Sequence, residues 1–287
     1  MQFKEQLAEK LKDKLNEGEL KLLPAGFQFI GDIVILNLKP ELNKYEKEIG
    51  EATLAVLPRF RTICARTGAI TGKYREPQLK VVAGISNTET IHLENGCKYK
   101  LDICKLMFAK GNISERARLA RLVKKEEIIV DMFAGIGYFS VPLGKLSTAG
   151  KIYSIEWNPN AFHYLNENIK LNKIKNVETF LGDNREIIPK LLERGIKADR
   201  IVMGLLPPPK DFIETAFSIA KKGTVIHYED ILSSDDEKRK KEIRKTITLF
   251  EEKAKEKGFG AELMHVQRVK GYAPKLDHYV LDIKVIQ

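Results

Sequence analysis

The sequence predicts an α/β protein whose larger part is a mostly parallel sheet with helices on both faces. From residue 128 onward, short apolar segments alternate with amphipathic ones. Such alternation is typical of parallel strands, because each return crossover needs a helix. The first 107 residues show short strands and turns behind a helix, which indicates a smaller α+β domain. We therefore predict two domains, 1–107 and 108–287.

The N-terminal domain is predicted to begin with a helix over residues 1–18. Phe3, Leu7, Leu11 and Leu15 recur every four residues there and form one apolar stripe. Apolar runs bounded by Gly, Pro and Asn predict the remaining elements. These are a strand pair within 27–38, a helix over 40–57 and short strands between 60 and 107.

In the C-terminal domain, each apolar run predicts a buried strand and each amphipathic run a helix. The strands are expected at 128–133, 151–156, 177–182, 198–203 and 223–228. The helices are expected at about 137–146, 159–172, 184–193, 209–221 and 235–257. No helix separates 261–270 from 278–286, so these segments are expected to close the sheet as an antiparallel hairpin.

Ahead of this ladder, the segment "NISE" at 112–115 predicts the start of another helix. Asn112 is a favoured N-cap residue, and Glu115 three positions later is the partner found in a capping box. We therefore expect these two side chains to satisfy free amides at the start of that helix.

The composition is that of a globular protein with a sizeable core. Of the 287 residues, 43% are hydrophobic and 31% are charged, and no apolar run approaches the ~20 residues of a membrane span. The N-terminal stretch carries charges throughout, unlike a signal peptide. Cys64, Cys97 and Cys104 lack CxxC spacing, which favours reduced thiols in a cytoplasmic protein. We predict no membrane association and no metal site.

The net charge of +10 is concentrated in the first part of the chain. Residues 1–125 hold 23 Lys and Arg against 15 Asp and Glu, whereas the remainder holds 26 against 24. A basic surface favours a polyanionic partner, since each neutralised phosphate releases counterions. A solvated charged face is the alternative reading. The candidate contacts to nucleic-acid phosphates are Arg59, Arg61, Arg66, Lys73 and Arg75.

A glycine-rich turn follows the first strand of the predicted parallel sheet, in "IIVDMFAGIGYFSVPLGK". Gly135 and Gly137 permit a tight turn and the close approach of a ligand, and Asp131, just ahead of them, is a further candidate to bind that ligand. The next strand ends on Glu156, where a carboxylate can accept hydrogen bonds from two ribose hydroxyls. This arrangement predicts a nucleoside site at the carboxyl ends of the strands.

The third strand ends on Asp183 and Asn184, whose side chains suit the edge of an adenine. The turn has Ser140 where a dinucleotide motif has its third glycine, and no Lys-Ser/Thr follows, so no phosphate cradle is predicted. S-adenosylmethionine, which carries a nucleoside and no phosphate, is therefore the predicted cofactor. Structural interpretations are also open: glycines can serve turns alone, and Asp183 can simply cap a helix.

Several segments resemble one family of tRNA-modifying enzymes. They are "DMFAGIGYFSVPL", "SIEWNPNAFHYLNENIKLN", "GDNRE" and, upstream, "ENGCKYKLDICKLMFAKGNISERARLA". The family contains the tRNA guanine-N1 methyltransferases acting at position 37 and the wybutosine-synthesising 3-amino-3-carboxypropyl transferases of phenylalanine tRNA. The likeness covers roughly residues 60–287. It implies a class I S-adenosylmethionine-dependent, Rossmann-like fold, with S-adenosylmethionine as co-substrate and tRNA as partner.

The end of the fourth strand is similar to the aminocarboxypropyl-transferase branch. It reads Gly204-Leu205-Leu206-Pro207, where the methyltransferase branch resembles Asn-Leu-Pro and uses the Asn oxygen to orient a nitrogen. Glycine has no side chain for that task. The resemblance implies that Gly204 lies at the cofactor and that Pro207, with its fixed φ, forms a stiff wall beside it.

The segment "FAKGNISER" matches the same branch at Asn112, Glu115 and Arg116. The resemblance implies a charge-assisted bond from Arg116 to the methionine carboxylate. Ala109 stands where the family has Ser, so only a backbone contact can be made there. Tyr138 replaces the usual Pro of the methyltransferase branch and is a candidate to stack on the acceptor base.

The predicted activity is transfer of the aminocarboxypropyl group to the tricyclic base at position 37 of phenylalanine tRNA, leaving methylthioadenosine. The alternatives are methyl transfer to guanosine 37 or to the tricyclic base, and a non-catalytic RNA-binding module. No dedicated general base is evident. His227 and Glu229 lie at the end of a strand and are candidates, with structural polar residues as the alternative. The oligomeric state is left open.

Overall fold

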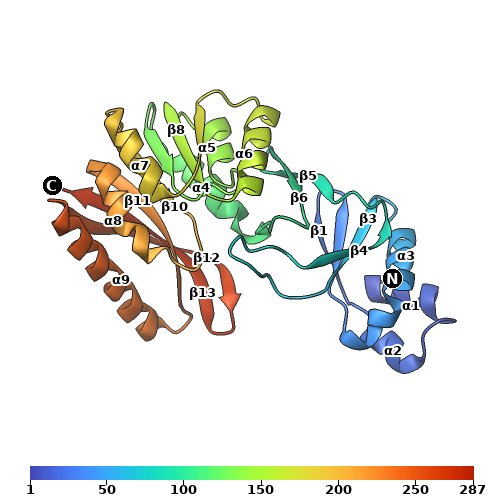
Figure 1. Cartoon of the computed structure of the whole chain (residues 1–287). Coiled ribbons are helices and arrows are strands. Elements are labelled where there is room, and N and C mark those ends of the chain that lie inside the picture. Colours follow the sequence, from blue (N-terminus) through green and yellow to red (C-terminus); the bar gives the residue numbers. More distant parts are fainter. The chain divides into compact units, whose positions relative to one another are not determined.

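The structure, a computed structural model, describes residues 1–287 (Figure 1). Its contacts divide the chain into two compact units. The N-terminal unit comprises Met1–Glu94 and Lys98–Phe108, and the C-terminal unit comprises Asn95–Cys97 and Ala109–Gln287. The domain boundary after residue 107 stays a proposal. No helix in either unit combines the length and the apolar character needed to cross a bilayer.

The N-terminal unit contains a four-stranded sheet and helices. The strands are β1 Gln28–Ile30, β2 Ile33–Leu36, β3 Thr62–Arg66 and β4 Leu79–Gly84, and a separate pair is formed by β5 Glu89–Glu94 and β6 Cys97–Asp102. The helices are α1 Phe3–Leu11, α2 Glu17–Leu22, the 3-10 helix η1 Pro40–Tyr45 and α3 Glu46–Val56. β1 and β2 form a hairpin, whereas β2 and β3 run parallel because η1 and α3 form the crossover between them.

The predicted helix over 1–18 is too long, because α1 ends at Leu11 and a second helix begins at Glu17. The Asn16 Oδ1 accepts a hydrogen bond from the Glu19 amide at 2.9 Å, and the Glu19 carboxylate accepts one from the Asn16 amide at 3.0 Å. This capping box starts a new helix at residue 17. The apolar stripe still works as predicted in α1, where Leu7 and Leu11 are buried.

Seven strands form the sheet of the C-terminal unit. They are β7 Ile128–Asp131, β8 Lys151–Glu156, β9 Val177–Leu181, β10 Ala198–Met203, β11 Ala220–Ser233, β12 Gly260–Ala273 and β13 Leu276–Ile286. Their order is β12-β13-β11-β10-β7-β8-β9. β7 to β11 pair in parallel, and β13 is antiparallel to both β11 and β12. The predicted parallel sheet with a closing antiparallel hairpin is confirmed.

Helices cover both faces of this sheet (Figure 1). They are α4 Ile113–Leu122, α5 Ser140–Leu146, α6 Pro159–Leu171, α7 Asn184–Glu193, α8 Ile213–Ile219 and α9 Asp236–Glu256. Apolar side chains of α7, α8 and α9 share one core with the strands. Leu119 of α4 and Leu143 of α5 belong to a second core, on the opposite face, with Ile129 of β7.

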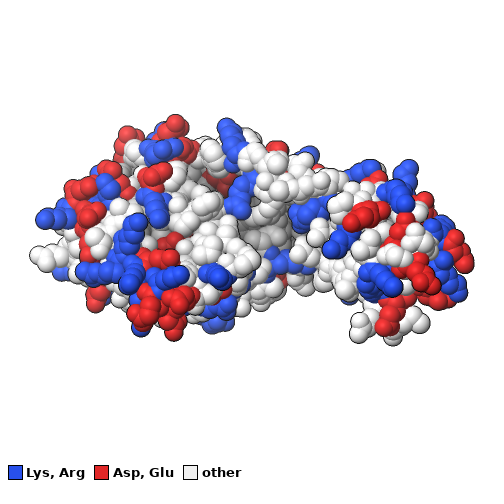
Figure 2. Space-filling model, turned by 90° about the horizontal axis from the view of Figure 1, so that it is seen from below, with Lys and Arg blue, Asp and Glu red and all other residues white.

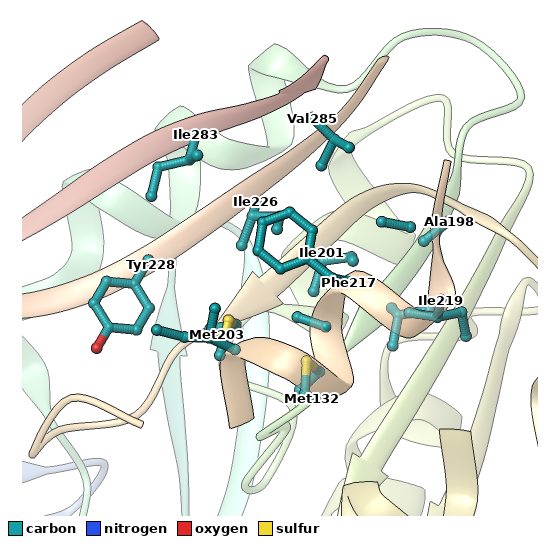
Figure 3. Packing of buried hydrophobic residues seen from close by; sticks show 14 of the residues in the cluster. Met132, Ala198, Ile201, Met203, Phe217, Ile219, Ile226, Tyr228, Ile283 and Val285 are labelled. Carbon is teal, nitrogen blue, oxygen red and sulfur yellow. The ribbon is translucent and has the colours of Figure 1, made fainter. Parts of the chain in front are cut away.

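The first of these cores joins the parallel strands to the closing hairpin (Figure 3). Ile201 and Met203 of β10, Ile226 of β11 and Ile283 of β13 cluster with Phe217 of α8, and all five are fully buried. Burying an aromatic or branched side chain contributes about 1.5–3 kcal/mol. This packing fixes the carboxyl ends of β10 and β11.

The strand order reverses at the neighbouring strands β7 and β10. β8 and β9 continue on one side of this pair, and β11, β13 and β12 on the other. In open α/β sheets, ligands bind outside the carboxyl ends of strands at such a switch point. The glycine turn follows β7 and Gly204 follows β10, so both predicted site segments lie there.

Candidate functional site

The glycine turn between β7 and α5 requires glycine at both predicted positions. Gly135 and Gly137 have φ values of 56° and 96°, in the region that side chains disfavour. A Cβ atom on Gly135 would lie 2.7 Å from the Tyr138 ring, and one on Gly137 would lie 2.7 Å from Cγ2 of Val141. The turn itself therefore requires both glycines, and Gly135, which is only partly buried, leaves backbone accessible at the carboxyl edge of the sheet.

Glu156, the last residue of β8, is bonded to that turn. Its Oε2 accepts a hydrogen bond from the Gly135 amide, and its Oε1 accepts one from the Asn158 amide, both at 2.7 Å. Burial raises the pKa of the Glu156 carboxyl, while the two amides favour its charged form. The carboxylate is held rigidly and keeps lone pairs for ribose hydroxyls, which supports its predicted role.

Asp131 lies behind the turn and is fully buried. Its Oδ2 accepts a hydrogen bond from Ser140 Oγ at 2.6 Å, and that hydroxyl lies 2.7 Å from Ser154 Oγ. Burial raises the pKa of Asp131 to about 7. The predicted direct contact with the cofactor is corrected, because no atom of Asp131 is exposed. Its carboxyl instead joins β7, α5 and β8 and positions the turn.

Asp183 and Asn184 follow β9 and have different surroundings. Asp183 caps α7 by accepting a hydrogen bond from the Arg185 amide at 2.8 Å, and it also pairs with the Arg185 guanidinium, which lowers the Asp183 pKa. Asn184 is buried, and its Nδ2 donates to the Met132 carbonyl at 2.5 Å. The Asn184 Oδ1 has no hydrogen-bond partner. The capping role of Asp183 is therefore present, and Asn184 supplies an available acceptor.

Three residues predicted to lie near the methionine arm or the acceptor base occur together. Arg116 of α4 is almost fully buried, and its Nη2 donates to the Ala109 carbonyl at 2.9 Å. Its guanidinium lies 4.8 Å from the centroid of the Tyr138 ring. Ala109 thus contacts Arg116 through its backbone, and this contact does not depend on the Ser hydroxyl that the family has at this position. The roles of Arg116 and Tyr138 toward a ligand stay predictions.

The predicted capping box at the start of α4 is wrong. Asn112 occupies the N-cap position, but its side chain makes no capping hydrogen bond and its Oδ1 is buried without a partner. Glu115 pairs with Arg118, whose Nε and Nη2 both lie 2.7 Å from its carboxylate. Arg118 also binds Asp282 of β13, at 2.7 and 3.0 Å. A charge-assisted bidentate pair is stronger than a hydrogen bond from a neutral amide, so Glu115 pairs with Arg118 instead of capping the helix.

Gly204 follows β10 and lies against an aromatic ring. A Cβ atom on Gly204 would lie 2.5 Å from Cε2 of Phe139. An Asn at this position, as expected for the methyltransferase branch, would therefore require the Phe139 ring to shift. Pro207 is exposed, and Pro209 is the N-cap of the 3-10 helix η3, Lys210–Phe212. The predicted wall formed by Pro207 stays a prediction.

Family models match both parts of the chain. The model described as the TRM5/TYW2 methyltransferase domain matches residues 90–263, and that described as the TYW2 N-terminal domain matches residues 7–88. The chain belongs to the TRM5/TYW2 family. The predicted family is thereby confirmed.

Two relatives in the TRM5/TYW2 family carry different activities in their names. A Pyrococcus horikoshii protein, "tRNA(Phe) (4-demethylwyosine(37)-C(7)) aminocarboxypropyltransferase", is 39% identical over 286 residues, which cover 99% of this chain and 98% of that protein. A Pyrococcus abyssi protein, "tRNA (guanine(37)-N(1))-methyltransferase Trm5b", is 37% identical over 267 residues, which cover 92% of this chain and 76% of that protein. The crystal structure of P. horikoshii TYW2 in complex with MeSAdo has a TM-score of 0.83 and 36% identity, with 99% of each chain covered.

His227 has no ring nitrogen available for catalysis in this TRM5/TYW2 chain. Its Nδ1 lies 2.6 Å from Asp282 Oδ1, and its Nε2 lies 2.5 Å from Nη1 of Arg200. Burial lowers the pKa of the ring, despite the opposing effect of Asp282. The candidate catalytic role of His227 is therefore corrected, since both nitrogens join β11 to its neighbours β10 and β13.

The structure contradicts one of the five predicted RNA contacts, that of Arg61. Its Nε donates to Asp32 at 2.7 Å, its Nη1 donates to the Asn87 carbonyl at 2.7 Å, and its Nη2 donates to the Glu89 carbonyl. These bonds join β3 to the β1–β2 hairpin and to the segment entering β5. Arg61 therefore stabilises the N-terminal unit, and its donors are not directed at a phosphate.

The other four basic candidates stay predicted RNA contacts. Arg59 is exposed, with its guanidinium 4.5 Å from the centroid of the Phe60 ring. Arg66, at the end of β3, lines a cavity of about 510 Å³. Lys73 and Arg75 lie in the loop between β3 and β4. On the face shown in Figure 2, basic and acidic side chains are intermixed over each unit, so net charge alone does not locate an RNA surface.

Proposed function

We propose that the chain transfers the 3-amino-3-carboxypropyl group of S-adenosylmethionine to the tricyclic base at position 37 of phenylalanine tRNA and releases methylthioadenosine. The observation that carries this proposal is Gly204 itself, with the Phe139 ring 2.5 Å from where its Cβ atom would lie. The resemblance to the methyltransferase branch implies a polar side chain at this strand end, and here the strand end has none. The P. horikoshii relative is named for transfer to C7, a ring carbon, where no nitrogen has to be oriented.

S-adenosylmethionine binds at the carboxyl edge of the sheet of the C-terminal unit. Gly135 and Gly137 give the adenosine access to the backbone, Glu156 accepts the ribose hydroxyls, and Asn184 accepts from the adenine edge. Arg116 pairs with the methionine carboxylate. The rigidity of Glu156 and the free Oδ1 of Asn184 support these assignments. MeSAdo in the P. horikoshii structure is the nucleoside that aminocarboxypropyl transfer leaves behind.

The reaction is a substitution at carbon. C7 of the acceptor base attacks the γ-carbon of the methionine arm, the bond from that carbon to sulfur breaks, and sulfur keeps the electron pair. The C7 proton then leaves, which restores the aromatic ring. The sulfonium supplies the electrophile, so the protein acts mainly by placing the γ-carbon, and not the methyl group, in line with C7.

The acceptor is a base in a single-stranded anticodon loop, which can be turned out into a protein pocket. Tyr138, half-buried beside Arg116, offers a face on which such a base stacks. Arg59, Arg66, Lys73 and Arg75 of the N-terminal unit contact phosphates elsewhere on the tRNA. Phenylalanine tRNA is assigned from the name of the P. horikoshii relative.

Methyl transfer is the second candidate, because the Trm5b relative is 37% identical and is named for N1-methylation. Two preparations of S-adenosylmethionine separate the candidates, one labelled in the carboxyl carbon and one in the methyl group. We expect only the carboxyl label to enter tRNA that carries the tricyclic precursor. Entry of the methyl label alone would overturn the proposal.

A further inference from the structure

Lys270 of the closing hairpin reaches the start of α4. Its side chain crosses Gly111, so that a Cβ atom on Gly111 would lie 2.3 Å from Lys270 Cδ and 2.6 Å from Nζ. Burial and the positive charge of Arg116 lower the pKa of Lys270, whereas Glu229 raises it. Lys270 therefore lies at the start of the helix that carries the almost fully buried Arg116, and both positive charges would attract an anion bound there.

Glu229 of β11 is the acidic neighbour of this pair, and it is 4% exposed. Its Oε2 lies 3.4 Å from Nε2 of the fully buried His278, and its Oε1 has no hydrogen-bond partner. The nearby N-cap residue Asn112 also has an unpartnered Oδ1. A buried acceptor without a donor is destabilising, and more so when it is charged, so these two acceptors are suited to a ligand that supplies the donors.

The strand register places these groups at the ligand-binding edge of the sheet. His278 lies opposite Ile231 of β11 on one side and opposite Lys270 of β12 on the other. Glu229, two residues before Ile231, therefore shares the face of both. The parallel pairing of β10 with β11 ends at Tyr228. Lys270, Glu229 and His278 thus lie just beyond the carboxyl end of β10, where Gly204 follows.

We propose that Lys270 and Glu229 bind the zwitterionic end of the methionine arm, Lys270 sharing its carboxylate with Arg116 and Glu229 accepting from its ammonium. The inference rests on the proposed function, since it deepens the same cofactor site. The ligand brings a carboxylate to two cationic side chains, and it brings a donor to Glu229, whose Oε1 has no hydrogen-bond partner. With both charged groups held, the arm is fixed at its α-carbon, and this limits the positions that the γ-carbon can take.

Binding of two nucleosides to the purified full-length chain tests this. S-adenosylmethionine carries the methionine arm, and methylthioadenosine lacks it. We expect Lys270→Met and Glu229→Gln each to weaken S-adenosylmethionine by about 10-fold or more, the loss of one charge-assisted bond. Methylthioadenosine should change by less than about two-fold. The matched controls are Lys284→Met and Glu262→Gln, which lie toward the far end of the same hairpin.

Gly111→Ala is a second variant, which removes no charge. The new methyl group displaces the Lys270 head group, so S-adenosylmethionine should again weaken relative to methylthioadenosine. Equal loss of both nucleosides would mean general damage and would overturn the inference. Unchanged binding of both nucleosides would also overturn the inference. Unchanged binding together with lost transfer to tRNA would overturn it too, because that result would place Lys270 and Glu229 at the acceptor base. Nucleoside binding does not depend on which carbon is transferred. A negative result in the binding experiment therefore does not affect the label experiment, and a negative label experiment does not affect the binding result.

Discussion

The ring of Phe139 occupies the space that a side chain at position 204 needs, with Cε2 only 2.5 Å from a Cβ atom built on Gly204. Phe139 is itself buried and packs with Val202 of β10 and Leu143 of α5. One aromatic residue thus sets the shape of the strand end after β10, which the proposed function places beside the methionine arm. Any side chain added at position 204 therefore requires this ring to shift.

Gly204→Ala should therefore destabilise the C-terminal unit by about 1–3 kcal/mol, as overpacking of a dense core does. We expect a lower melting temperature and reduced turnover, because a displaced Phe139 moves the adjoining glycine turn. Gly26→Ala is the control, since a Cβ atom there meets nothing within 4 Å. Equal melting temperatures for Gly204→Ala and Gly26→Ala would show that the Phe139 ring moves aside without destabilising the C-terminal unit.

Glu156→Ala should weaken S-adenosylmethionine and methylthioadenosine alike, by about 10- to 100-fold. Both nucleosides keep the ribose, and both lose an acceptor that is held by two amides at 2.7 Å. Calorimetry with each nucleoside measures the effect, with the exposed Glu193→Ala as control. Unchanged affinity in a folded Glu156→Ala variant would remove this residue from the site.

Asp131→Asn should change how stability depends on pH. The pKa of Asp131 is about 7 in the folded chain and ~4 in an unfolded one, so folding favours the protonated form. The stability that Asp131 contributes is complete below pH ~4 and is lost as the pH rises through about 7. The variant cannot ionise, so its melting temperature relative to the wild type should rise over this window. Asp13→Asn, at an exposed position, is the control, and a difference that stays constant with pH for Asp131→Asn would contradict this expectation.

Charge reversal at Arg66 and Lys73 should weaken tRNA binding and reduce the slope of log affinity against log salt, by roughly one unit for each phosphate that is no longer neutralised. Arg61→Gln should leave the slope unchanged and lower the melting temperature, because its donors bond to Asp32, Asn87 and Glu89. Filter binding over a salt series distinguishes the two behaviours. A slope that changes only with Arg61→Gln would reverse their assignment.

Much of the sheet could be predicted from the sequence, because local patterns decide it. The bounds of β8 and β10 agree with the predicted strands, since apolar runs end there at Glu156 and Gly204. The ends of the apolar runs also located the glycine turn after β7 and the acidic residue at the end of the next strand. Parallel strands bring such ends together, so local reasoning also located the edge of the sheet where the site lies.

Partners from distant segments could not be predicted in this way. Whether His227 is free depends on Arg200 and Asp282, and whether Glu115 caps its helix depends on Arg118. Phe139 and Lys270 were missed because their significance depends on contacts with Gly204 and Gly111, which the sequence does not reveal. A glycine at a strand end and one at a helix start were the available signals, since each marks a close approach.

The co-product of turnover tests the central claim most directly. The chain is incubated with S-adenosylmethionine and tRNA that carries the tricyclic precursor at position 37, with unmodified tRNA as the control, and the nucleosides released are separated by chromatography and mass. Aminocarboxypropyl transfer predicts methylthioadenosine in proportion to modified tRNA, and none with the control. S-adenosylhomocysteine formed in proportion to methylated tRNA would contradict the account.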